Sequence, residues 1–168
     1  MALSADERKQ FADLANRAYR VVEQAMQAYT QASGMPRRFG LGVYDASDGG
    51  ASFDPETLPG RAIADFRIEP ENWGDRDYIA TVRRKLAVAI RTGRDTADVV
   101  KNAPELLLES DMRAPGGVLG EVGGKPIGIG GSGFRGPEDA VFASLLLEAM
   151  KRLHGDYDQA TPPRPAGS

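Results

Sequence analysis

Apolar residues recur at helical spacing near the start of the chain and predict one long amphipathic helix over residues 4–34. Ser4 and Glu7 stand three positions apart at its beginning, which is the spacing of a capping box. Gly34 and Pro36 follow the last apolar position and mark the end of the helix.

The same periodicity predicts a second helix over residues 75–93 and a final one over residues 136–154. The apolar stripe of the second helix comprises Ile79, Val82, Leu86 and Ile90, and Gly93 closes it. In the final helix we expect Gly136 at the N-cap and Pro137 at the first helical position. Two acidic residues follow in its first turn, where the helix dipole favours them.

Strand signals occupy two other segments. Phe39, Leu41 and Val43 alternate with other residues and predict a strand, after which residues 51–53 could begin a return strand. The segment 116–131 reads as a hairpin with Gly123 and Gly124 at its turn. Residues 54–73 show no clear periodicity, and an irregular segment of that length is more often functional than a plain connector. Residues 94–110 are expected to hold one or two short helices.

Composition narrows the class of protein. With 168 residues, 41% of them hydrophobic and 27% charged, the chain has the size and composition of one soluble domain. The net charge of −3 argues against nucleic-acid binding, which usually shows a basic face. Without cysteine and with His154 as the single histidine, a zinc site is not expected. No membrane-spanning run or signal-peptide pattern is present, so a cytoplasmic location is the default expectation.

The stretch "GSGFRG", from Gly131 to Gly136, matches the G-x-G-x-x-G spacing of dinucleotide-binding loops. In those proteins a second parallel strand follows, with an acidic residue about 20 positions on. Here the helix after the glycines is the last expected element, and the acids Asp156 and Asp158 fall in the C-terminal tail. The nucleotide interpretation therefore fails. The glycines are expected to permit tight turns and close strand contacts, or to form with Arg135 a nest for an anionic group.

Several segments occur in the order found in one known family. The stretches "GVYDASDGG", "VRRKLAVAIRTGRDTADV" and "RAPGGVLGEVGGKPIGIGGSG" resemble the signature of the GlcG/HbpS family, also described as DUF336 or PduO C-terminal-domain-like. The resemblance covers roughly residues 10–153. It implies an α+β fold in which an antiparallel sheet of about five strands is flanked by helices. We therefore expect a single domain over residues 1–155 and a disordered tail over residues 156–168.

The resemblance also implies a homo-oligomer, dimeric or larger, with a small-molecule pocket near a subunit interface. Some members bind haem, others accompany glycolate or propanediol metabolism, and hydroxylaminobenzoate lyases are suspected to lie near the group. Haem-binding members often use a histidine in the N-terminal helix, which this helix lacks, although Tyr19, Tyr29 or Tyr44 could substitute. No cofactor is therefore expected, with haem as the open alternative.

Candidate site residues follow from residue type and position. Lys85 matches the helix lysine of the family and borders the buried face of its helix, where it could bind an anion or move a proton. Arg113 and Arg135 could together clamp a carboxylate. The candidate catalytic residues are Lys85, Asp45, Glu121 and Tyr44, and the candidate substrate-binding residues are Arg113, Arg135, Trp73, Gly131, Ser132 and Gly133. Trp73 could form an aromatic wall of the pocket with Phe66 and Tyr78. Each candidate has an ordinary structural alternative, such as a turn-forming Asp45 or three aromatic residues that pack on the core.

Two functions of different class remain at this point. One is a pocket for a small anionic, aromatic carboxylate ligand, either simply bound or turned over by a cofactor-independent lyase that acts on an acid such as 4-hydroxylaminobenzoate. The other is a non-catalytic protein that binds haem or another tetrapyrrole. The segment "LPGRAIADFRIEPENWGDRDY" is rich in arginine and aromatic residues and favours the carboxylate. The absence of histidine from the first helix weakens the haem alternative.

Overall fold

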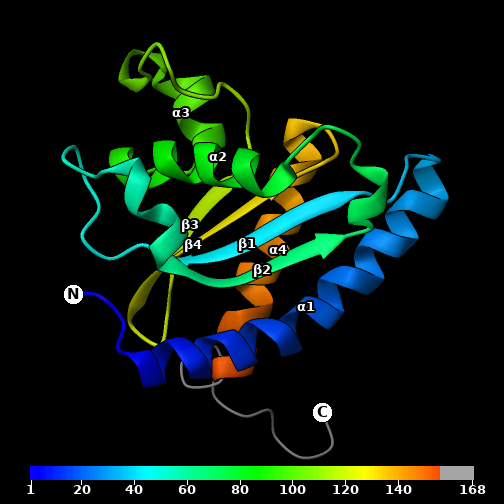
Figure 1. The fold of residues 1–168 in the computed structure, drawn as a ribbon, viewed down its shortest axis with the longest axis horizontal. Coiled ribbons are helices and arrows are strands. Elements are labelled where there is room, and N and C mark those ends of the chain that lie inside the picture. Colours follow the sequence, from blue (N-terminus) through cyan, green and yellow to red (C-terminus); the bar gives the residue numbers. More distant parts are fainter. Residues whose placement is uncertain (156–168) are drawn as a thin grey trace, which may run out of the picture.

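Four α-helices surround one antiparallel sheet of four strands in the computed structural model, which describes residues 1–155 (Figure 1). The helices are α1 (Ala5–Ser33), α2 (Tyr78–Thr92), α3 (Thr96–Asn102) and α4 (Gly136–His154). The strands are β1 (Phe39–Asp45), β2 (Ala62–Ile68), β3 (Gly117–Val122) and β4 (Lys125–Ser132), and short 3₁₀ turns η1 (Pro55–Arg61), η2 (Pro70–Asn72) and η3 (Pro104–Leu106) lie between them. The predicted α+β class is confirmed, with four strands in place of about five.

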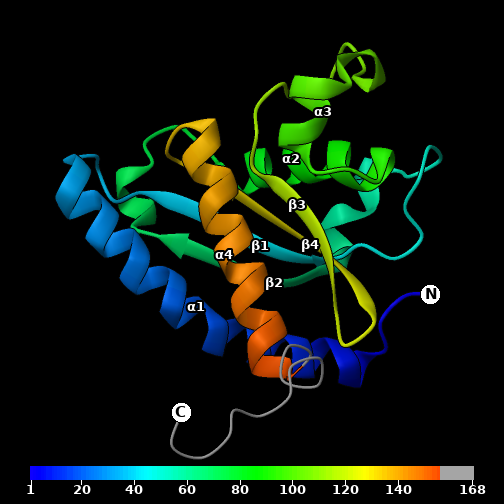
Figure 2. The same cartoon turned by 180° about the vertical axis from the view of Figure 1, so that it is seen from behind.

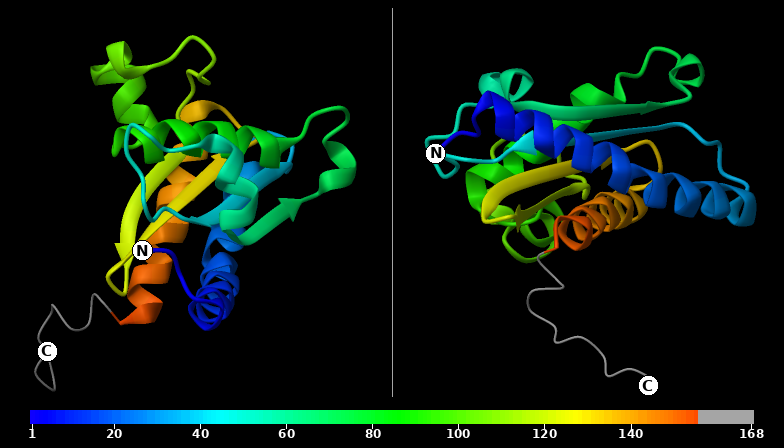
Figure 3. Two further views of the ribbon diagram at one scale, coloured as in Figure 1. Left: turned by 60° about the vertical axis from the view of Figure 1, so that its left-hand side comes forward. Right: turned by 90° about the horizontal axis from the view of Figure 1, so that it is seen from below.

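The sheet is sandwiched between two helical layers. Its strand order is β2-β1-β4-β3, and every neighbouring pair is antiparallel. Helices α1 and α4 pack against each other and cover one face, whereas α2 covers the other face (Figures 2 and 3). A helix that buries one stripe against a sheet is a standard way to build such a core.

The ends of the helices obey the rules of capping. Ser4 and Glu7 form the predicted capping box at the start of α1, each bonded to the backbone of the other. Gly34 ends α1 in the left-handed conformation, and Gly93 ends α2 in the same way. At the start of α4 the N-cap is Arg135 and not the expected Gly136, so Gly136 rather than Pro137 is the first helical residue.

The two central strands, β1 and β4, have large apolar side chains on the face toward α1 and α4 and mostly glycine on the face toward α2. On β1, the side chains of Phe39, Leu41 and Val43 enter the core under α1 and α4, and on β4 those of Ile127 and Ile129 do the same. The alternate positions toward α2 are mostly glycine. A Cβ on Gly130, for example, would lie 2.7 Å from Val82 Cγ1 and 3.1 Å from the Val82 carbonyl oxygen. Glycine at such positions lets α2 lie almost directly on the strand backbone.

The segment 54–73 is more regular than its sequence suggests. It contains η1, the strand β2 and η2, and β2 pairs along β1 as an edge strand of the sheet. Residues 51–53 form no return strand, so that expectation was wrong. The prolines at both ends of the segment obscured a strand whose side chains are only partly buried. The expected tail over residues 156–168 lies outside the described residues.

Candidate functional site

The glycine loop joins β4 to the start of α4 and is held by contacts that leave no room for side chains. The Gly131 N–H donates to the Gly116 carbonyl oxygen at 2.9 Å. Gly116 has φ +142°, and a Cβ there would lie 2.6 Å from the Gly131 oxygen and 2.8 Å from Lys85 Nζ. The "PGG" and "IGG" glycines therefore allow two chain segments and a lysine to meet closely.

Lys85 and Asp139 form a buried ion pair beneath this loop. Lys85 Nζ lies 2.8 Å from Asp139 Oδ2 and donates to the Gly131 carbonyl oxygen at 3.0 Å. Asp139 Oδ1 accepts the Phe134 N–H at 2.9 Å. Both side chains are only 3% exposed. Burial raises the pKa of the Asp139 carboxyl, and the Lys85 ammonium opposes that rise.

A pocket of about 380 Å³ opens over this pair and is called here the glycine-loop pocket. It is lined by Arg76, Asp77, Tyr78, Thr81, Lys85, Met112, Ala114, Ser132, Gly133, Phe134, Gly136 and Asp139. Three residues predicted from the sequence, Lys85, Ser132 and Gly133, meet here. Asp139 was expected only as a charge in the first turn of its helix. Its position three residues before the buried Phe142 is the sequence signal that places it inward.

The two predicted arginines do not line this pocket. Arg113 is exposed and lies between the lining residues Met112 and Ala114. Arg135 is also exposed, and its guanidinium pairs with the Glu138 carboxylate. The lining arginine is Arg76, which sequence reasoning missed. Among residues 1–155, Arg76 has no ion-pair partner.

Trp73 and Glu121 lie away from the pocket lining. The Trp73 indole is buried, donates to the Ile68 carbonyl oxygen at 3.0 Å and packs edge-on against Tyr78, with ring centroids 5.0 Å apart. It supports the pocket through Tyr78. Glu121 is exposed on β3, opposite Pro126 in the register.

Tyr44 and Asp45, the other two predicted catalytic residues, are fully buried and bonded elsewhere. The Tyr44 hydroxyl donates to Asp65 Oδ1 at 2.9 Å and accepts from Arg83 Nε at 3.1 Å. Burial, together with the Asp65 charge, raises the pKa of Tyr44 far above its usual range. These contacts hold β1 to β2 and α2.

Asp45 ties the residues before α1 to the turn after β1. Its carboxylate accepts the Leu3 N–H at 2.9 Å, the Ser47 N–H at 2.9 Å and the Ser47 hydroxyl at 2.5 Å. Burial alone would raise the pKa of Asp45, but these hydrogen bonds outweigh it and leave the pKa below its usual value.

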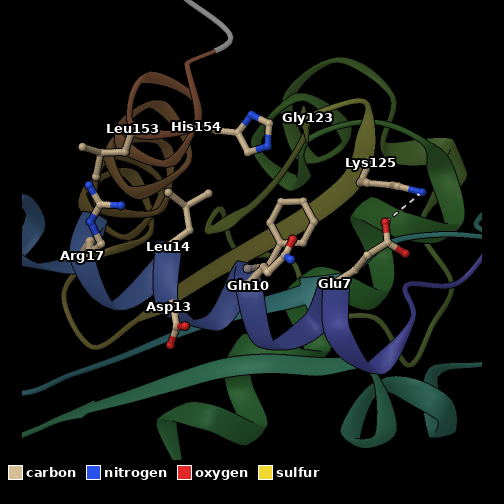
Figure 4. A pocket seen from close by; sticks show the side chains of 10 residues that line it. Glu7, Gln10, Asp13, Leu14, Arg17, Gly123, Lys125, Leu153 and His154 are labelled. Carbon is tan, nitrogen blue, oxygen red and sulfur yellow. Dashed lines mark ion pairs between the residues drawn. The ribbon is translucent and has the colours of Figure 1, made fainter.

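A second, larger hollow of about 450 Å³ lies between the start of α1, the hairpin turn and the end of α4, and is called here the α1–α4 groove (Figure 4). It is lined by Glu7, Gln10, Phe11, Asp13, Leu14, Arg17, Gly123, Lys125, Leu153 and His154. The His154 ring is parallel to that of Phe11, with centroids 6.2 Å apart. Arg17 stands at one end of the groove and the Lys125–Glu7 ion pair at the other, with His154 between them (Figure 4).

The tyrosines considered as substitute haem ligands are engaged in the core. Tyr19 stacks on Phe66 with centroids 4.3 Å apart, and burial raises its pKa to about 12. The Tyr29 hydroxyl contacts Met35 Sδ and Glu138. Tyr44 is bonded as described. His154, which lies at the C-terminal end of the last helix as the sequence predicts, is therefore the better-placed candidate ligand.

Two classes of feature are absent from the described part of the chain. Residues 1–155 contain no group of three or more His, Cys, Asp or Glu side chains placed to hold a metal ion. Within the same residues, no helix is both long and apolar enough to span a membrane.

Comparison with known proteins identifies the fold. No protein-family model matches the sequence, and no curated protein matches it significantly. A double mutant of HbpS from Streptomyces reticuli is similar in structure, with a TM-score of 0.57 and 19% identity over 91% of this chain and 87% of that one. A second HbpS structure gives a TM-score of 0.56 and 20% identity over 88% and 89% of the two chains. The PduOC–haem complex gives a TM-score of 0.51 and 19% identity over 89% and 95%. The protein thus has the fold of HbpS and PduOC, and the resemblance seen in the sequence is confirmed at the level of the fold.

Proposed function

We propose that this protein is a small-molecule-binding protein of the GlcG/HbpS group and that it binds a haem-type tetrapyrrole in the α1–α4 groove. The observation that carries the proposal is the place of His154, the chain's single histidine, on the wall of the larger hollow. The PduOC–haem complex, which has the same fold, supports the choice of ligand.

The residues of the groove fit such a group chemically. An imidazole is a common axial ligand of haem iron. Phe11, Leu14 and Leu153 supply an apolar wall, which a porphyrin face requires. Arg17 and Lys125 provide cations for the carboxylates of a porphyrin. When bound, haem would supply iron as a redox or gas-binding centre, while the protein's own side chains hold and orient it.

Haemin titration followed by absorbance tests this proposal. We expect a Soret shift that saturates at one equivalent and is lost in His154→Ala. Arg94→Ala, which alters an exposed ion pair outside the groove, serves as the matched surface control and should leave the shift intact. A Soret shift that persists unchanged in His154→Ala would contradict the assigned site.

A second candidate function is a cofactor-independent lyase that acts on an aromatic acid such as 4-hydroxylaminobenzoate. The specific observation in its favour is the glycine-loop pocket, where Lys85 and Asp139 place an ammonium and a carboxylate side by side next to the Ser132 hydroxyl. Such a pair could transfer a proton to or from a bound acid.

Incubation of the metal-free protein with 4-hydroxylaminobenzoate, followed by absorbance, tests the lyase. Turnover reduced in Ser132→Ala and unchanged in His154→Ala would support a reaction in the glycine-loop pocket. Stoichiometric haemin binding without any consumption of the acid would leave the tetrapyrrole proposal and overturn the lyase.

A further inference from the structure

Several hydrogen-bond donors of the glycine-loop pocket have no partner among the described residues, whereas most of its carboxylate oxygens already accept a hydrogen bond. Lys85 Nζ has three donors, and its bonds to Asp139 and Gly131 engage two of them. No hydrogen bond of the Ser132 hydroxyl is found among residues 1–155. Asp139 accepts hydrogen bonds from Lys85 and Phe134 through both of its oxygens, and Asp77 accepts the Ile79 and Ala80 N–H groups through Oδ1. A ligand that accepts hydrogen bonds would complement the donors that remain.

Tyr78 adds an independent observation at the same place. Tyr78 is a lining residue of the pocket, it is only 4% exposed, and its hydroxyl is buried without a partner in the described part of the chain. A buried polar group left unsatisfied destabilises a fold, so such groups usually have a partner in water or a ligand. The ring is fixed by Trp73, which packs edge-on against it.

The charge and the walls of the pocket narrow the ligand class. Arg76 supplies a guanidinium without an ion-pair partner among the described residues, directly before the Asp77 that caps α2. Lys85 and Asp139 balance each other, and the other lining carboxylate, Asp77, accepts the first N–H groups of α2, so Arg76 is the lining cation available to a ligand. Phe134, Met112 and the Tyr78 ring provide apolar surface.

We propose that the glycine-loop pocket binds the carboxylate of a small aromatic acid through Arg76 and Tyr78, with the ring of the acid against Phe134 and Met112. The inference rests on the pocket of the second candidate function, and it assigns carboxylate recognition to residues at the start of α2 instead of to Arg113 and Arg135. It needs neither haem nor turnover, and binding of the acid should persist in haem-loaded protein because His154 is not part of this pocket.

Calorimetric titration of the full chain with benzoate in the millimolar range tests the proposal, with benzamide as the neutral isostere. We expect benzoate to bind and benzamide to bind at least about tenfold more weakly, because a charged hydrogen bond is lost. Arg76→Gln should weaken benzoate binding more than about tenfold and Tyr78→Phe several-fold. Arg113 and Arg135 are exposed like Arg76 but do not line the pocket, so the matched controls Arg113→Gln and Arg135→Gln should change benzoate binding less than about twofold.

Three results would overturn the assignment: absence of benzoate binding, equal binding of benzamide, or a loss in Arg113→Gln as large as in Arg76→Gln. Urea denaturation of ligand-free Tyr78→Phe separates ligand recognition from a structural role. Removing an unpartnered buried hydroxyl should leave the protein as stable as the wild type or more so, whereas a structural hydroxyl would destabilise it when removed. The haemin titration of wild-type protein is independent of all these outcomes, so failure here and failure of tetrapyrrole binding can be told apart.

Discussion

The glycine-loop pocket and the α1–α4 groove both contain a lysine paired with a carboxylate, but the two pairs are held in opposite ways. Lys85 and Asp139 are each 3% exposed and are fixed by further bonds to the backbone of the loop. Lys125 and Glu7 are each 34% exposed and lie 3.1 Å apart at the rim of the groove. A buried pair becomes costly when one partner is removed, whereas an exposed pair is screened by water and salt. The Lys85–Asp139 pair is thus expected to be required for stability of the fold, whereas the Lys125–Glu7 pair can be substituted at little cost in stability.

Removing one ammonium from each pair tests this difference most strongly. Lys85→Met should lower the free energy of unfolding by about 3–5 kcal/mol, because Asp139 is left as an unpaired buried carboxylate. Lys125→Met, the same change in the exposed pair, should lower it by less than about 1 kcal/mol. Urea denaturation measures both. An equal loss of unfolding free energy in the two variants would mean that the protein tolerates an unpaired Asp139 carboxylate.

A buried carboxylate held by hydrogen bonds without a lysine supplies an intermediate case. Asp45→Asn should destabilise the protein by about 2–3 kcal/mol at neutral pH, because the charged acceptor of three hydrogen bonds is lost. Since the folded-state pKa of Asp45 is lowered, its contribution is complete above the unfolded-state pKa of about 4 and disappears as the pH falls below it. Urea curves between pH 7 and pH 3 should therefore show the gap between wild type and variant narrowing with acid. A gap that is constant with pH would argue against an ionised Asp45.

The close packing of α2 on the sheet can be tested by adding one methyl group at Gly130. Gly130→Ala should destabilise by about 1–2 kcal/mol, because the new Cβ would overlap Val82. Gly60→Ala is the matched control, since a Cβ at that position meets nothing within 4 Å. Its thermal midpoint should stay within the range of ordinary surface substitutions. Equal thermal midpoints for the two variants would mean that α2 can move away from the strand at little cost in free energy.

The smallest effect on stability is expected in the groove. His154→Ala should change the free energy of unfolding by no more than about 0.5 kcal/mol, because the residue is exposed at the end of its helix. A loss of haemin binding in the same variant would then report on the site alone. Destabilisation comparable to that of Asp45→Asn would instead assign the ring a structural role against Phe11.

Local patterns predicted the helices and the hairpin well. Helical spacing, the Ser4 capping box and the glycines that end α1 and α2 are short-range signals, and the structure follows each of them. Strand β2 was missed because its partly buried residues follow a proline-containing turn and precede another proline. Its pairing with β1 is a tertiary contact that no local pattern contains.

The site was predicted in part for a similar reason. Lys85 could be found from its place beside an apolar stripe, but its partner Asp139 stands 54 positions away. Arg113 and Arg135 were chosen for their nearness in sequence to the glycines, and both side chains are exposed outside the pocket lining. Arg76 and Tyr78 enter the pocket only because the start of α2 folds over the end of β4.

The glycines of the two central strands also set the tolerance of the molecule for ligand size. Val82 of α2 lies directly on the backbone of β4 at Gly130. Helix α2 therefore cannot move closer to the sheet when a ligand enters the pocket beside Lys85. A larger ligand would have to be accommodated by movement of the other lining residues, which include Arg76, Met112 and the loop around Gly133. The fixed distance between β4 and α2 would then limit the size of ligand that the pocket accepts. The affinities of a series of benzoates with substituents of increasing size would measure this limit.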